Sequence, residues 1–145
     1  MTSENSFAVL SIISGLNWLL LILFPTCLLV RRLTLYGTVA LLSLCYFLLM
    51  WKTNYLFVTQ GLSSYQAYKT VLGIDNLVLA GWAHYLAFDL LVGLYINKIS
   101  EANSLSRWLV VPIMVTTYFL GPIGFLAFLV VKTVTTNIKS FFHEL

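Results

Sequence analysis

Long apolar segments alternate with short polar ones along the whole chain. Four segments are almost entirely apolar: 7–30, 33–51, 75–96 and 108–131. Charged or polar residues follow each segment and end the apolar run. A helix needs about 20 apolar residues, each rising about 1.5 Å, to cross a hydrocarbon core of about 30 Å. The pattern therefore predicts an all-α fold, a four-helix bundle integral to a membrane. An even number of spans would place both ends of the chain on one side.

The remaining residues connect these spans within one domain, residues 1–145. Segment 53–74 mixes amide and hydroxyl side chains with four aromatic ones: Tyr55, Phe57, Tyr65 and Tyr68. The segment is too polar to span and is predicted to lie at the membrane interface, either as an aromatic belt at headgroup level or as a lid over a site. The tail, 132–145, is predicted to be a frayed or interfacial continuation of the fourth helix.

Composition excludes the other structural classes. The chain has 145 residues, of which 60% are hydrophobic and 9% are charged, and its mean hydropathy is +0.93. These values lie outside the range of soluble domains, and a disordered chain would need low hydrophobicity and high charge. Eight basic and five acidic residues are too sparse for a nucleic-acid surface, so no nucleic acid is expected as a partner. Cys27 and Cys45 lie inside apolar runs and are expected to pack as small hydrophobic residues.

The basic residues divide evenly between the two predicted sides of the membrane. One side carries Arg31, Arg32, Lys98 and Arg107, and the other carries Lys52, Lys69, Lys132 and Lys139. The compact Arg31-Arg32 pair favours both chain ends lying outside, because basic residues concentrate in short cytoplasmic loops. The first residues lack the Arg- and Ser-rich composition of an organelle transit segment, which indicates either a bacterial protein, in the inner membrane, or a chain from which such a segment has been removed.

Ionisable side chains in the middle of a span are confined to the third segment. His84 lies about 13 Å and Asp89 about 21 Å along this helix from Asp75, and a charged group in hydrocarbon costs at least about 2.5 kcal/mol. Trp82 and Tyr85 share one helix face with Asp75 and Asp89, whereas His84 borders that face. A neighbouring helix would allow His84 and Asp89 to line one cavity. Without a mid-span cation, Asp89 is expected to be neutral or paired with a protonated His84, and both residues are candidate catalytic groups.

A purely structural role competes with this hypothesis. Asp89 and His84 would then hydrogen-bond neighbouring helices, with Asn17, Thr116 or Thr117 as partners. Asn17 is also a candidate ligand contact. Two histidines, one of them in the tail, are too few for a closed metal site, so no metal is expected; the identity of any other cofactor stays open.

The fourth segment contains the run Gly121-Pro122-Ile123-Gly124 at its middle. Pro122 lacks an N–H and displaces a carbonyl of the preceding turn, which predicts a kink, and the glycines permit close backbone approach. This surface would either pack against another helix or form a ligand pocket with Pro122 and Gly124. No phosphate-binding loop, serine-hydrolase elbow, Cys-x-x-Cys pair or zinc-protease motif is present in the sequence.

The third segment contains a recognisable block, Gly81-Trp82-Ala83-His84-Tyr85-Leu86-Ala87-Phe88-Asp89-Leu90-Leu91-Val92-Gly93. This block resembles the abscisic-acid-deficient-4-like family of small membrane proteins linked to neoxanthin formation in plants. The later Gly121-Pro122-Ile123-Gly124-Phe125-Leu126 with Lys132 is similar to that family's second block. The resemblance implies conversion of the epoxycarotenoid violaxanthin into the allenic neoxanthin, in a plastid membrane in plant relatives.

The resemblance also implies roles for residues of the third segment. An acid near the epoxide oxygen and a base near the polyene would suffice for this isomerisation, and Asp89 and His84 would fill these roles in either order. Trp82 and Tyr85 would line a carotenoid groove. Two functions stay open: an isomerase acting on a carotenoid or another isoprenoid, and a protein that binds a pigment or a partner without chemistry. Membrane lipid is an expected partner, and the glycine face of the fourth segment favours a homo-oligomer.

Overall fold

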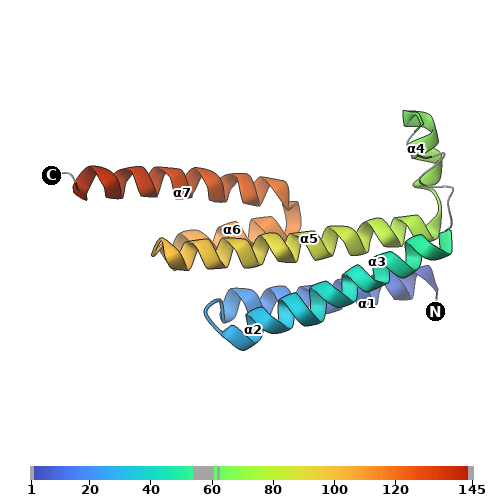
Figure 1. Cartoon of the computed structure of the whole chain (residues 1–145), viewed down its shortest axis with the longest axis horizontal. Helices are drawn as coiled ribbons and strands as arrows, with labels where there is room; N and C mark the ends of the chain where they lie inside the picture. The colour runs from blue at the N-terminus through green and yellow to red at the C-terminus, as the bar shows by residue number, and fades with distance from the viewer. Residues whose placement is uncertain (1, 54–60, 62, 144–145) are drawn as a thin grey trace.

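The computed structural model describes residues 2–53, 61 and 63–143, with side chains described up to residue 135. The described part is helical, which confirms the predicted all-α class (Figure 1). Tyr55 and Phe57 lie outside the described residues. The elements are α1 (Ser3–Leu23), α2 (Leu28–Arg32), the π-helical segment η1 (Leu33–Val39), α3 (Ala40–Thr53), α4 (Tyr65–Val71), α5 (Asp75–Ala102), α6 (Arg107–Leu120) and α7 (Pro122–His143).

The first helix ends earlier than the apolar pattern suggests. α1 stops at Leu23, and Phe24 leaves the helical region with φ −125° and ψ 56° because Pro25 follows it. The next helix begins at Leu28 and runs without a gap through α2, η1 and α3 to Thr53. Arg31 therefore belongs to the first turns of the second helix rather than to the end of the first.

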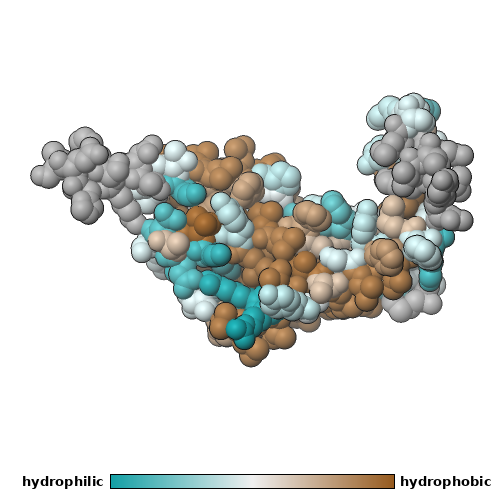
Figure 2. Space-filling model, viewed as in Figure 1, coloured by the Kyte–Doolittle hydropathy of each residue, from teal (hydrophilic) through white to brown (hydrophobic). Residues whose placement is uncertain are grey.

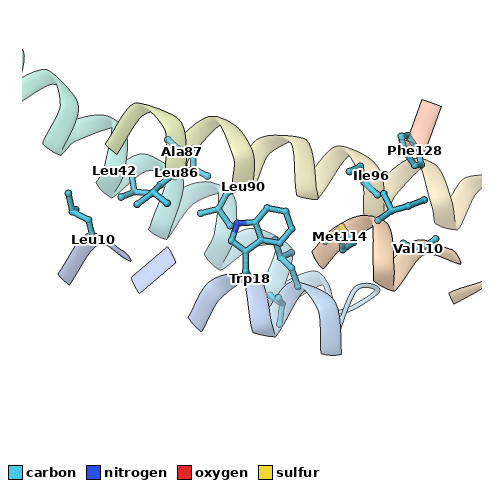
Figure 3. Packing of buried hydrophobic residues seen from close by; sticks show 14 of the residues in the cluster. Leu10, Trp18, Leu42, Leu86, Ala87, Leu90, Ile96, Val110, Met114 and Phe128 are labelled. Atoms are coloured by element: carbon cyan, nitrogen blue, oxygen red, sulfur yellow. The ribbon is translucent and has the colours of Figure 1, made fainter. Parts of the chain in front are cut away.

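Helix α5 is the central element, at about 42 Å for its 28 residues. It packs against α3 over its first half, against α1 over most of its length, and against α6 and α7 over its second half (Figure 1). The buried core lies between these helices and includes Leu42, Leu90 and Ile96 (Figure 3). The six-membered ring of Trp18 in α1 packs against Gly93, where an added Cβ would be 2.8 Å from the ring. A glycine at this position therefore lets α1 approach α5 closely.

The predicted fourth span is two helices, not one kinked helix. α6 ends at Gly121, whose φ of +32° turns the chain, and α7 begins at the next residue. The two helices then lie against each other, with Gly124 touching the backbone of Thr117. α7 runs back along α5, where Tyr95 packs edge-on against Phe128 with ring centres 6.1 Å apart. We call this unit the α6–α7 hairpin.

The hairpin changes the expected arrangement of spans. Among the described residues, three helices are long and apolar enough to cross a membrane: Ser3–Leu23, Leu28–Thr53 and Asp75–Ala102. α6 has 14 residues and a length of about 21 Å, less than the hydrocarbon core of about 30 Å. The start of α1 and the end of α7 consequently lie toward opposite ends of α5, whereas an even number of spans predicted both at one end (Figure 1).

Candidate functional site around Asp89

The predicted polar face of α5 packs along α1. Ser3 donates a hydrogen bond to Asp75 over 3.1 Å at the start of the two helices. Further along, the indole N–H of Trp82 donates to Ser11 Oγ over 2.9 Å, and the ring of Phe7 stacks on Trp82 at 4.7 Å between centres. The two helices therefore run in the same direction, and these contacts fix the rotation of α5 about its axis.

Asp89 lies at the middle of α5, directly beside the turn of the α6–α7 hairpin. Its side chain is buried, with 8% exposure. The hydroxyl of Tyr85, one turn earlier, interacts electrostatically with the carboxyl group, while Oδ2 has no hydrogen-bond partner within the described residues. A Cβ added to Gly121 would lie 2.9 Å from Oδ1. Two features therefore require glycine at position 121: the positive φ, and the carboxyl group of Asp89, which occupies the space of a Cβ.

Tyr118 is the residue of this site that the sequence did not single out. It lies near the end of α6, and its ring centre is 5.8 Å from that of Trp18. Its hydroxyl would be 3.2 Å from a Cβ placed on Gly15, and it interacts electrostatically with Tyr85. In the sequence Tyr118 is one aromatic residue in an apolar run, and only the packing of α6 against α1 and α5 shows which neighbours it has. We refer to Asp89, Tyr85 and Tyr118 as the Asp89 cluster.

A cavity of about 300 Å³ adjoins the Asp89 cluster. It lies between α1, α5 and α6 and is lined by Ser11, Trp82, Tyr85, Leu86, Tyr118 and Phe119. The rings of Trp82 and Tyr85 stack with centres 5.3 Å apart and form one aromatic wall. Asp89 is not among these lining residues and reaches the cavity through the Tyr85 hydroxyl. The arrangement can therefore hold a flat apolar molecule against two phenol groups, one of which is backed by a carboxyl group.

His84 lies on a different face of α5. It is five residues from Asp89, about 140° round the helix axis. Its ring packs against Phe88 at 4.5 Å and against Tyr46 of α3 at 5.7 Å between centres. It lines a second cavity of about 220 Å³, to which Tyr68, in the connection before α5, also contributes. The expectation that a neighbouring helix brings His84 and Asp89 into one cavity is therefore not met.

The other predicted contacts separate into different environments. Asn17 is buried, and its Oδ1 has no partner within the described residues. Pro122 is exposed as the first residue of α7, where its missing N–H removes no helical hydrogen bond. Gly124 packs against Thr117 inside the hairpin, which matches the packing alternative for this run. The hydroxyl of Thr117 donates to Ile113 of its own helix over 2.8 Å, so it is not the partner of Asp89.

Comparison with known proteins identifies the family. No significant match is found among curated proteins or among solved structures. A family model described as ABA DEFICIENT 4-like matches residues 5–128, a range that includes most of α1, all of α5 and the turn of the α6–α7 hairpin. Because this match covers most of the chain, with the Asp89 cluster inside it, the protein belongs to the ABA4-like family.

Proposed function

We propose that the chain is a multi-pass protein of a bacterial inner membrane, with three spans and a re-entrant α6–α7 hairpin. The proposal rests on the lengths of the helices and on the apolar side chains that they expose. The described basic residues near the second half of α5 and the hairpin are Arg31, Arg32, Lys98, Arg107 and Lys132, and those near its start are Lys52 and Lys69. This excess assigns the hairpin to the cytoplasmic half of the membrane.

Cysteine labelling tests this topology. In a variant with both native cysteines replaced by alanine, Ser106→Cys and Thr133→Cys are expected to react with a membrane-impermeant maleimide from the same side. Glu4→Cys is expected to react from the opposite side, because α1 starts at the other end of α5. A continuous fourth span would instead place positions 106 and 133 on opposite sides, and that result would contradict the hairpin.

We further propose that the protein is a membrane-embedded isomerase of epoxycarotenoids or related isoprenoids. The observation that carries this proposal is the aromatic cavity beside the buried carboxyl group of Asp89. A polyene is flat, apolar and long, and stacks on aromatic rings such as Trp82 and Tyr85. Family membership is consistent with a role related to neoxanthin formation.

The Asp89 cluster would supply both an acid and a base to one cavity: Tyr118 of α6 as the acid, and Tyr85 of α5 with Asp89 as the base. In the proposed reaction, Tyr85 and Asp89 together accept a proton from a polyene carbon, and that C–H electron pair becomes the second double bond of an allene. The epoxide C–O bond breaks at the same time, and its electron pair stays on oxygen, which takes a proton from Tyr118. Transfer of a proton between the two phenols restores the starting state. The product is an isomer of the substrate, so the reaction balances without an oxidant or reductant.

The position of the cavity suits a substrate dissolved in lipid. Trp82 and Tyr85 lie within two turns of Asp89 on α5, and Tyr118 and Phe119 lie at the tip of the α6–α7 hairpin, so the cavity is near the middle of the proposed bilayer. A molecule dissolved in the lipid would reach the cavity sideways between α1 and α6. The same geometry would serve a pigment-binding protein without chemistry, and product analysis separates the two functions.

The test is to express the protein in cells that produce epoxycarotenoids and to analyse bound and total pigments by chromatography and mass spectrometry. The wild type is expected to form an allenic isomer. Ser11→Leu is expected to abolish both binding and conversion, because the larger side chain fills the cavity and removes the bond that holds Trp82. Ser6→Leu, in the same helix but lining another cavity, is the matched control and is expected to stay active. Bound but unchanged pigment in the wild type would favour the binding protein.

A further inference from the structure

A third cavity, whose lining residues include two arginines and a glutamate, lies at the far end of the bundle from Asp75. It measures about 110 Å³ and is enclosed by the turn after α1, the end of α5 and the start of α6. Figure 2 shows a band of hydrophilic residues at this end of the molecule. The cavity is lined by Pro25, Thr26, Arg31, Asn97, Ser100, Glu101, Ser104, Leu105, Arg107 and Val110. None of these residues belongs to the Asp89 cluster.

Two arginines are held in place at this cavity by backbone carbonyls. Arg31 Nε donates to the carbonyl of Pro25 over 2.6 Å, and its Nη2 forms an ion pair with Glu101 at 2.6 Å. Arg107 Nη2 donates to the carbonyl of Ile22 over 2.7 Å. These bonds orient both guanidinium groups and use only part of the donor set that each group carries. The remaining N–H donors can serve a ligand.

Ser100 gives an independent indication of a ligand. It lines the cavity, is only 5% exposed, and its hydroxyl has no hydrogen-bond partner within the described residues. A buried hydroxyl without a partner is costly, and such groups are usually satisfied by a bound molecule or water. Ser100 lines the same cavity as Arg31 and Arg107 and would add a neutral donor to their charged ones.

The charge and surroundings of the cavity define the ligand class. Arg31 and Arg107 outweigh the single carboxylate of Glu101, so the ligand is anionic, and the planar guanidinium fork matches phosphate oxygens. Nearby apolar side chains are exposed, including Leu28 and Leu29 of α2 and Trp108 at 90%. A phosphate here would therefore continue into acyl chains along the protein surface. Basic pockets between membrane helices bind anionic lipid headgroups in this way.

We propose that this cavity binds the phosphate of an anionic membrane lipid through Arg107, Arg31 and the hydroxyl of Ser100. Glu101 reduces the net charge but holds the Arg31 guanidinium in position. The lipid would join the turn after α1 to the start of α6, and thereby connect the hairpin with the first span. This site is independent of the proposed reaction at the Asp89 cluster.

Lipid binding to the full chain in detergent micelles tests the proposal. Dioleoyl phosphatidic acid, dioleoyl phosphatidylcholine and inorganic phosphate are titrated separately and followed by native mass spectrometry and thermal midpoint. We expect phosphatidic acid to bind at least about ten-fold more tightly than phosphatidylcholine. Arg107→Gln is expected to weaken phosphatidic acid binding about ten-fold, the effect of losing one charged hydrogen bond. Arg32→Gln, at the same end but not lining the cavity, is expected to change it less than about two-fold.

Ser100→Ala provides a second test that leaves both arginine contacts intact. It is expected to weaken binding of phosphatidic acid about three-fold, because it removes one neutral hydrogen bond. Equal binding of the two lipids, or equal losses in Arg107→Gln and Arg32→Gln, would overturn the site in favour of general electrostatic attraction. Binding of inorganic phosphate as tight as that of phosphatidic acid would overturn the lipid assignment. Unchanged binding in Ser100→Ala would contradict the role of the hydroxyl.

Discussion

Asp89→Asn is expected to reduce isomerisation by about 100- to 10,000-fold while leaving pigment bound, the range typical of losing a general acid or base. Asparagine keeps the size of the carboxyl group and an acceptor oxygen for Tyr85, so the contact with Gly121 survives. It cannot take up the proton that leaves the polyene. The measurement is the initial rate of epoxycarotenoid consumption per mole of purified protein, with bound pigment determined in the same sample.

The matched control is Asp75→Asn, which removes a carboxyl group from the same helix at its exposed end. This variant is expected to keep the wild-type rate. Tyr85→Phe is expected to behave like Asp89→Asn, because Asp89 contacts the cavity through the Tyr85 hydroxyl. A normal rate in folded Asp89→Asn would show that the carboxyl group serves only to support the turn of the α6–α7 hairpin.

Gly124→Ala is expected to lower the free energy of unfolding by about 3 kcal/mol, the upper part of the range for an overpacked interior. The new methyl group would overlap the backbone of Thr117, which cannot move without opening the hairpin. The measurement is the thermal midpoint in detergent, followed by circular dichroism. Gly81→Ala is the control, since no other group lies within 4 Å of the added methyl there. Alanine is also the better helix former, so this control is expected to be neutral or stabilising. Equal stability of Gly124→Ala and the wild type would contradict the tight hairpin.

The apolar pattern of the sequence predicted the helical class and most of the long helices, because these helices are apolar and continuous. The shared face of Trp82, Tyr85 and Asp89 follows from helix geometry alone, and the structure places that face against α1. The same helix geometry places His84 about 140° round the helix axis from Asp89. It does not reveal which helix packs against His84. The structure puts α3 there, through Tyr46.

The reversal at Gly121 was beyond the reach of sequence patterns. A glycine followed by proline inside an apolar run is equally typical of a kinked helix, and the choice depends on tertiary contacts. Here the side chain of Asp89 fills the space that a Cβ of residue 121 would need, and Thr117 meets Gly124 across the turn. Tyr118 enters the Asp89 cluster because α6 packs against α1 and α5, a tertiary arrangement that the apolar pattern of the sequence does not reveal.

In the proposed three-span topology, the α6–α7 hairpin also gives the protein an unequal cross-section in the two leaflets. Three helices cross one half of the proposed bilayer, whereas the same three and both arms of the hairpin occupy the other half. The molecule is therefore a wedge, and its insertion expands one monolayer more than the other. We expect its distribution to follow membrane curvature and lateral pressure, with enrichment where the leaflet that contains the hairpin is stretched.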